Sequence, residues 1–244
     1  MKPFLLVSTR PEEEALDSEY QAYLHASGLA RHELELAEFD LLGLPPLDPA
    51  QYSGVFIAGS PYGAGSTDGY ISQTQQRVRS ELQDLFAQLL EAETPLLATG
   101  TAMTILAELL GASVSPDNAE LAEVIEVEKV REAADDPITA TLPSIFHAYT
   151  NHGEAIDELP EGAVRLARSL DTPFQIVRFN DQVYATQFNP ELDGAAIYSQ
   201  AVAFEDAGDT GFGDVEALVA AGRHTEGHHK SGQILANFVE NFRA

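Results

Sequence analysis

Two threonines occupy the place in this sequence that is most suggestive of a nucleophile. The chain contains no cysteine, which excludes disulfides, thiolate metal sites and cysteine nucleophiles. Thr99 and Thr101 flank Gly100 between a predicted strand and a predicted helix. A threonine hydroxyl attacks a carbonyl only with a base beside it, whereas hydroxyls at turns commonly bond to nearby backbone. Both interpretations of these threonines, nucleophile and turn former, stay open at this point.

A glycine-rich loop at residues 59–66 follows an apolar strand and begins with Gly59, Ser60 and Pro61. It lacks the Gly-Lys-Ser/Thr ending of a P-loop and the spacing of a dinucleotide fingerprint. Small-molecule crevices in α/β sheets lie at the carboxyl ends of strands. The loop is therefore either a plain connection or the rim of a small-molecule pocket.

Three histidines near the end of the chain could suggest a metal site. His224 and His228 stand four residues apart, and His229 follows. Gly227 interrupts the segment, however, and no carboxylate stands at a known metal-binding spacing. We predict exposed or capping roles for these histidines, no metal site and no cofactor.

The charge of the chain is large and one-sided. There are 13 basic and 39 acidic residues, which gives a formal net charge of −26. Such a surface repels nucleic acid and anionic membranes, so neither is a predicted partner. Solubility or salt tolerance is the simplest explanation, and a dedicated basic partner is the alternative. The sequence shows no run of about 18 apolar residues and no signal-peptide core, so a cytoplasmic location is expected.

Apolar runs and amphipathic stretches alternate in the first half of the chain, as is typical of a sheet flanked by helices. The strands are predicted at residues 4–8, 33–39, 55–58 and 96–98, and the helices at 19–28, 71–91 and 103–110. After residue 112 strands predominate, at residues 124–130, 145–149, 164–167, 174–179 and 183–186. The tail returns to helix, with an apolar stripe that includes Leu235 and Phe238.

The length of 244 residues suits one compact α/β unit. We predict a single domain over residues 1–244, with residues 195–244 as a C-terminal helical extension. The predicted architecture has three layers, with a mostly parallel central sheet flanked by helices.

Four segments, in the expected order, resemble the class I glutamine amidotransferase family, in particular the glutaminase unit of GMP synthase and its stand-alone relatives. Residues 55–61 are similar to its strand and Gly-Gly-Pro loop. Residues 95–111 are similar to its strand, nucleophile turn and helix. Residues 151–154, Asn-His-Gly-Glu, are similar to its Trp-His-Gly-Asp segment, and residues 187–191, Gln-Phe-Asn-Pro-Glu, to its Gln-Phe-His-Pro-Glu. The resemblance implies a flavodoxin-like α/β fold.

In such enzymes a cysteine attacks the glutamine side-chain amide, a histidine takes its proton and a glutamate orients the histidine. The resemblance assigns the cysteine position to Gly100 and the histidine position to Asn189, and it leaves Glu191 as the only matching member. The second glycine of the turn is Ala102, and the glutamine that helps hold the substrate is Thr104. Glycine supplies no nucleophile, and asparagine does not accept a proton near neutral pH. The resemblance therefore implies the fold without the glutaminase reaction.

The leading hypothesis is a catalytically degenerate, non-enzymatic protein that binds a ligand or regulates a partner through the family pocket. Its ligand would be glutamine-like or a carboxylate, held by the backbone N–H groups of Ser60 and Thr101, with extra room beside Gly100. The resemblance assigns the pocket to Gly59, Ser60, Pro61, Thr99, Thr101, Thr104 and His152.

Two alternatives remain open. One is an active amidotransferase or hydrolase rebuilt on Thr99 or Thr101, with His152 as the nearest candidate base. The other is a protein-interaction scaffold for a synthetase or another protein partner.

Overall fold

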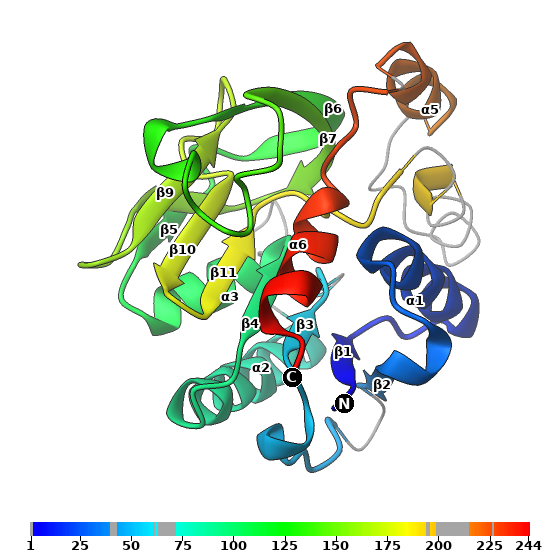
Figure 1. Ribbon diagram of the computed structural model, residues 1–244, viewed down its shortest axis with the longest axis vertical. Helices are drawn as coiled ribbons and strands as arrows, with labels where there is room; N and C mark the ends of the chain where they lie inside the picture. Colours follow the sequence, from blue (N-terminus) through cyan, green and yellow to red (C-terminus); the bar gives the residue numbers. More distant parts are fainter. Residues whose placement is uncertain are drawn as a thin grey trace.

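A nine-stranded sheet runs through the middle of the molecule (Figure 1). The computed structural model describes residues 2–39, 43–60, 62, 72–193, 196–198, 215–225 and 227–244. Pro61, residues 63–66 of the glycine-rich loop and much of the predicted C-terminal extension (residues 195, 199–214 and 226) lie outside the described residues. The strand order is β2-β1-β3-β4-β11-β10-β9-β6-β7.

Five neighbouring strands of this sheet run parallel to one another. They are short, and all but the edge strand β2 are wholly buried, because helices cover both faces of the sheet. These strands are β1 (Phe4–Ser8), β2 (Leu34–Glu38), β3 (Val55–Ile57), β4 (Leu96–Thr99) and β11 (Val183–Thr186). The order 2-1-3-4-11 places the topological switch point between β1 and β3, where α/β sheets bind ligands.

The sheet continues beyond β11 with antiparallel pairing. The strands of this part are β6 (Glu120–Lys129), β7 (Ile145–His152), β9 (Val164–Arg168) and β10 (Ile176–Asn180). Two short strands that the sequence did not predict, β5 (Ser113–Ser115) and β8 (Ala155–Glu158), form a separate two-stranded sheet. Single 3₁₀ turns occur at η1 (Arg31–Glu33), η2 (Pro49–Gln51) and η3 (Arg131–Ala133).

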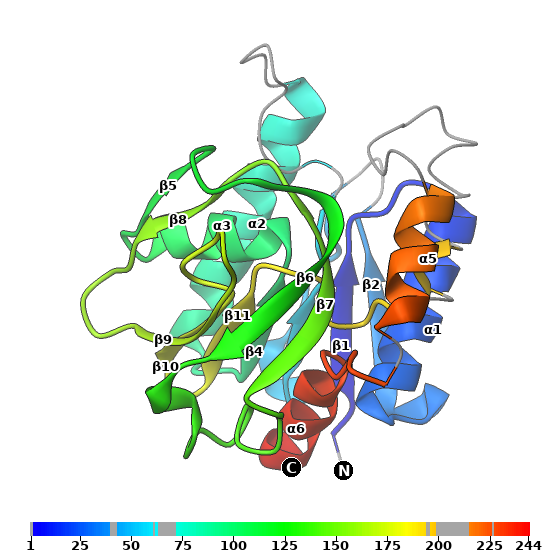
Figure 2. The same ribbon diagram turned by 90° about the horizontal axis from the view of Figure 1, so that it is seen from above.

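The helices form two layers, one on each face of the parallel strands (Figures 1 and 2). On one face, α1 (Glu13–Ser27) and α6 (Gln233–Phe242) pack against Phe4 and Phe56. On the other face lie α2 (Gln73–Glu91) and α3 (Thr101–Leu109). The helix α5 (Val215–His224) lies against β6 at the antiparallel end. In the part of the chain that the structure describes, no helix is both long and apolar enough to cross a membrane.

Local sequence explains where the helices begin and end. The N-cap of α2 is Ser72, whose hydroxyl accepts a hydrogen bond from the Gln75 N–H at 3.1 Å, while the Gln75 side chain accepts one from the Ser72 N–H at 2.7 Å. This reciprocal pair is a capping box. The helix α1 starts earlier than predicted, because Glu13 and Glu14 favour its first turn, and Gly28 ends it with a left-handed φ of 72°.

Aromatic packing attaches the C-terminal helix to the core. The ring of Phe238 on α6 lies 5.3 Å from that of Phe56 on β3 and 6.3 Å from that of Phe4 on β1, centroid to centroid. All three side chains are buried. Residues 4 and 238 are thus parts of one hydrophobic layer, and α6 completes it.

Candidate functional site

The turn between β4 and α3 centres on Gly100, at the carboxyl end of the parallel strands. Its backbone has φ 56° and ψ −131°, a conformation that residues with side chains adopt only under strain. The Gly100 N–H donates to the Thr186 carbonyl of β11 at 2.9 Å, and the Gly100 carbonyl accepts from the Met103 N–H at 3.0 Å. A sharp strand-to-helix turn of this kind is the backbone arrangement that presents a nucleophile in α/β hydrolases.

The side chain of Asn189 occupies the space beside this turn. A β-carbon placed on Gly100 would lie 2.5 Å from Asn189 Oδ1, and one placed on Gly59 would lie 2.6 Å from the same oxygen. The carboxamide therefore lies between the two glycines. Among the described residues, its Oδ1 is buried without a hydrogen-bond partner. The expectation that Gly100 enlarges the site is wrong, because the carboxamide fills the room that a side chain would need.

Glu191, two residues further on, is a buried acid. Both of its carboxyl oxygens lack a hydrogen-bond partner within the described part of the chain. Burial and the neighbouring Glu19 carboxylate raise the pKa of Glu191 to about 8, although its own backbone N–H and the Arg10 guanidinium act in the opposite direction. At pH 7 this carboxyl is therefore predominantly protonated and neutral.

Beneath this acid lies a buried ion pair. Arg10 Nε donates to Glu19 Oε1 at 2.8 Å, and the Ser8 hydroxyl donates to Glu19 Oε2. Arg10 and Glu19 are not among the site residues predicted from the sequence. A signal for Glu19 existed, because it lies on the same helix face as Leu16 and Tyr23, where a carboxylate is out of place unless it is paired.

Thr101 holds the glycine loop in place. Its hydroxyl accepts a hydrogen bond from the Ser60 N–H at 2.7 Å and donates one to the Ser60 carbonyl at 2.9 Å. The hydroxyl of Ser60 in turn accepts from the Thr9 hydroxyl at 2.8 Å. The expectation that the Ser60 N–H is available to a ligand is therefore wrong, since Thr101 already occupies that donor.

The hydroxyl of Thr99, like that of Thr101, is already hydrogen-bonded. Its hydroxyl lies 2.9 Å from the Tyr23 hydroxyl, and both side chains are completely buried. Burial raises the pKa of Tyr23 well above its ordinary value, with further increases from Glu191 and Glu19, so this phenol stays neutral. The Thr104 hydroxyl donates to the Thr101 carbonyl at 3.0 Å. Within the described residues, the hydrogen bonds of Thr99 and Thr101 include none to a base, so their geometry fits turn formation.

His152 belongs to a different polar cluster. Its Nε2 lies 2.9 Å from Glu120 Oε2 and its Nδ1 3.1 Å from the Glu154 carbonyl, so both nitrogens face acceptors. Burial disfavours the charged form of Glu120, but hydrogen bonds from His152, Ser169 and Gln175 outweigh it and lower its pKa. Neither nitrogen of His152 is available as a base for a threonine.

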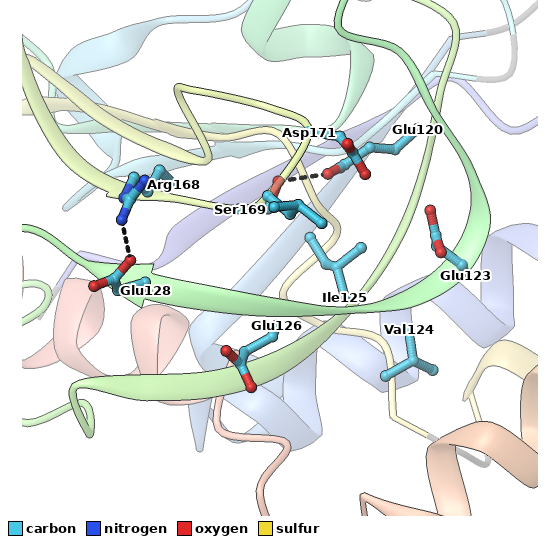
Figure 3. Close-up of a pocket in the computed structure, with 10 residues that line it drawn as sticks. Glu120, Glu123, Val124, Ile125, Glu126, Glu128, Arg168, Ser169 and Asp171 are labelled. Carbon is cyan, nitrogen blue, oxygen red and sulfur yellow. Dashed lines mark hydrogen bonds and ion pairs between the residues drawn. The ribbon is translucent and has the colours of Figure 1, made fainter.

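A cavity of about 420 Å³ lies beside this cluster, between β6 and the turn after β9 (Figure 3). Figure 3 shows Ser169 hydrogen-bonded to Glu120 above Ile125, and Arg168 paired with Glu128. Five carboxylates border this cavity, at Glu120, Glu123, Glu126, Glu128 and Asp171. Its lining does not include Gly100, Asn189 or Glu191.

A cavity of about 510 Å³ lies at the carboxyl ends of β1 and β2. Arg10, Phe39, Tyr62 and Arg77 are among its lining residues. Arg10, which lines this cavity, is paired with Glu19, and both of these charges act on the pKa of Glu191. In the described part of the chain, no three histidine or acidic side chains are grouped so that they could hold a metal ion.

Comparison with known proteins defines the class to which this fold and site belong. The family model described as glutamine amidotransferase class-I matches residues 16–200. The chain therefore belongs to the class I glutamine amidotransferase family.

The individual relatives include glutamine-hydrolyzing GMP synthases. That of Thermomicrobium roseum is 31% identical over 160 residues, which cover 66% of this chain and 27% of the relative. That of Thermosipho melanesiensis is 34% identical over 64 residues, or 26% of this chain and 12% of the relative. The chain thus matches about a quarter or less of the length of these relatives.

Solved structures confirm the predicted fold class. A glutamine amidotransferase of Thermotoga maritima superposes with a TM-score of 0.76 over 100% of both chains at 20% identity. A glutamine amidotransferase of Methylobacillus flagellatus gives a TM-score of 0.69 over 100% of this chain and 96% of its own, at 13% identity. The three-layer α/β architecture with a mostly parallel centre is therefore established.

Proposed function

We propose that this chain is a catalytically degenerate class I glutamine amidotransferase-like protein with a non-enzymatic binding or regulatory role. Gly100, Asn189 and Glu191 are then the vestiges of the cysteine, histidine and glutamate of the family. The observation that carries the proposal is the strand-to-helix turn at Gly100, which keeps a nucleophile-presenting backbone while Asn189 occupies the space of the side chain.

The state of Glu191 supports the same proposal. In a working triad the glutamate is ionised and orients a histidine. Here the carboxyl has a pKa of about 8 and faces no imidazole partner among the described residues. A neutral, unpaired acid does not perform the orienting role.

The proposed ligand is a glutamine-like molecule or a carboxylate, bound at the carboxyl edge of the parallel strands. The position of the Arg10-lined cavity supports this, because it lies at the strand ends beside the switch point. The proposed protein partner is a synthetase or a protein of similar role. It is supported by the similarity of this chain to glutamine-hydrolyzing GMP synthases.

An active hydrolase rebuilt on Thr99 or Thr101 is disfavoured by the contacts of both hydroxyls with Tyr23 and Ser60. The direct test is ammonia release from glutamine by the purified chain, measured with a coupled glutamate dehydrogenase assay. We expect ammonia release no faster than in a protein-free blank. Turnover that co-purifies with the chain and disappears in Thr101→Val would overturn the proposal.

Binding is tested by calorimetric titration with glutamine, glutamate and succinate. We expect saturable heat for at least one of them, lost in Arg77→Leu, which removes a cation from the lining of the cavity, and retained in Asn241→Leu, which changes an exposed asparagine on α6. If glutamine, glutamate and succinate all gave no heat of binding, the proposed ligand class would be refuted and the scaffold hypothesis would remain.

A further inference from the structure

The outer edge of the sheet, at β7, is covered by residues 227–230, which lie between α5 and α6 and are called the strap here. In Figure 1 the chain descends from α5 past β7 to α6. The His147 N–H of β7 donates to the His228 carbonyl at 2.9 Å, and His147 forms an isolated parallel bridge with His229. Uncovered strand edges pair readily with other chains, so the strap protects this one.

Three imidazoles meet where the strap contacts the strand. The ring of His147 lies 5.9 Å from that of His228 and 6.1 Å from that of His229, centroid to centroid. The ring of His229 also stacks on Tyr149 of β7 at 4.9 Å with an interplanar angle of 25°. The contact between strap and strand therefore consists largely of titratable rings.

The surroundings of His229 suit a neutral ring and not a charged one, whereas His228 is exposed. The Nε2 atom of His229 lies 2.6 Å from the Thr225 hydroxyl. The Nδ1 atoms of His229 and His147 are buried with no hydrogen-bond partner in the described residues. A neutral imidazole leaves only one nitrogen as a donor, whereas a protonated ring has two N–H groups to satisfy. Protonation would therefore bury an unpaired donor at Nδ1 and place like charges about 6 Å apart.

Several charged groups around the cluster affect the charge on its imidazoles. Burial lowers the pKa of His229, His147 and His228 lower it further, and Asp193, beyond β11, raises it. Glu126 of β6 is paired with His147 in the sheet register. From α5, apolar side chains reach this region, and Leu218 and Val219 pack with Tyr149. Asp193 and Glu126 are therefore carboxylates near the cluster, and the pKa of His229 is lowered in spite of Asp193.

The helix α5 is attached to the sheet by a small core of its own. Tyr149, Leu192, Ile197, Leu218 and Val219 form a buried cluster separate from the two large ones. Small satellite clusters open at lower free energy than the main core. The strap and α5 can therefore come away together while the central sheet stays folded.

We propose that the strap and α5 form a pH-dependent clamp, which a neutral His229 holds closed on β7 and which proton uptake at His229 opens, uncovering the strand edge. An exposed imidazole has an ordinary pKa of about 6.5, and in the closed form burial and the neighbouring His147 lower the pKa of His229 below its ordinary value. The closed form therefore loses stability as the pH falls below about 6.5. The clamp is independent of the proposed loss of catalysis.

Hydrogen exchange measured by mass spectrometry tests the clamp, with protection factors corrected for the intrinsic pH dependence. From pH 7.5 to pH 5.5, we expect protection in peptides covering residues 145–149 and 215–230 to fall at least tenfold. Peptides covering β4 and α3 should keep theirs. Two outcomes would overturn the proposal without any variant. One is equal protection of residues 145–149 and 215–230 at both pH values, and the other is a loss of protection in β4 and α3 as large as the loss in those two segments.

A variant pair sharpens the test. His229→Gln keeps a polar atom for Thr225 but does not titrate, so its protection should change less than threefold. His25→Gln, an exposed histidine on α1, should respond like the unmodified protein. A full pH response in His229→Gln would contradict the assignment to this cluster.

Discussion

Replacing Glu191 by glutamine should stabilise the protein at alkaline pH and leave it nearly unchanged in mild acid. The pKa of Glu191 is raised from 4.5 to about 8 by burial and by Glu19. Between these pH values the folded chain holds a proton that the unfolded chain has released, so stability falls as the pH rises from 4.5 to 8 and is constant above. At about 1.36 kcal/mol per pH unit, the loss approaches about 5 kcal/mol. Glutamine has a similar shape and no charge, so it avoids this loss.

The measurement is urea unfolding of the unmodified chain and of Glu191→Gln at pH 5, 7 and 8.5. The difference in the free energy of unfolding should grow in favour of the variant by several kcal/mol over this range. Glu14→Gln, an exposed acid on α1, is the matched control and should show a flat difference. If the Glu191→Gln difference were also flat, Glu191 would ionise freely in the folded state, and the description of the site as desolvated would be refuted.

Three further substitutions test the packing of the site and the core by urea unfolding. Gly100→Ala should lower the free energy of unfolding by about 2–3 kcal/mol, because of backbone strain and the clash with Asn189. In the Asn189→Ala background the same substitution should cost about 1 kcal/mol less. Equal costs in the two backgrounds would exclude the clash. Phe238→Ala should cost about 3–5 kcal/mol because it empties the layer below α6, and a loss below 1 kcal/mol would mean that α6 is not part of the core. Tyr23→Phe should cost about 1 kcal/mol by removing a buried partner of Thr99, and no loss would show that this hydrogen bond contributes nothing.

Much of the architecture could be predicted from local patterns. The strand at residues 4–8 was predicted with its observed bounds, because a buried parallel strand is a continuous apolar run. The helix at residues 71–91 was predicted to within two residues of α2, because its apolar face repeats at helical spacing. The strands β5 and β8 were not predicted, since each is too short to show a period and forms only by pairing with the other.

The resemblance singled out part of the candidate site and did not predict its contacts. The resemblance singled out Gly100 and Asn189, and the structure brings them together. It also grouped His152 with them, whereas the fold engages both nitrogens of that ring with Glu120 and Glu154. Arg10 and Glu19 were not predicted as partners, because their pairing depends on how α1 packs over the end of β1.

The sequence by itself determined which chemistry is absent and which elements form, since residue type and periodicity are local properties. A chain without cysteine has no thiolate, and a glycine between a strand and a helix leaves the turn without a side chain. Only the tertiary structure decided what fills the space beside Gly100, which groups share the low-dielectric environment of Glu191, and which rings meet at the edge of β7. Those outcomes depend on packing between segments as far apart as residues 19 and 191 or 147 and 229, and no local pattern encodes a distance across the fold.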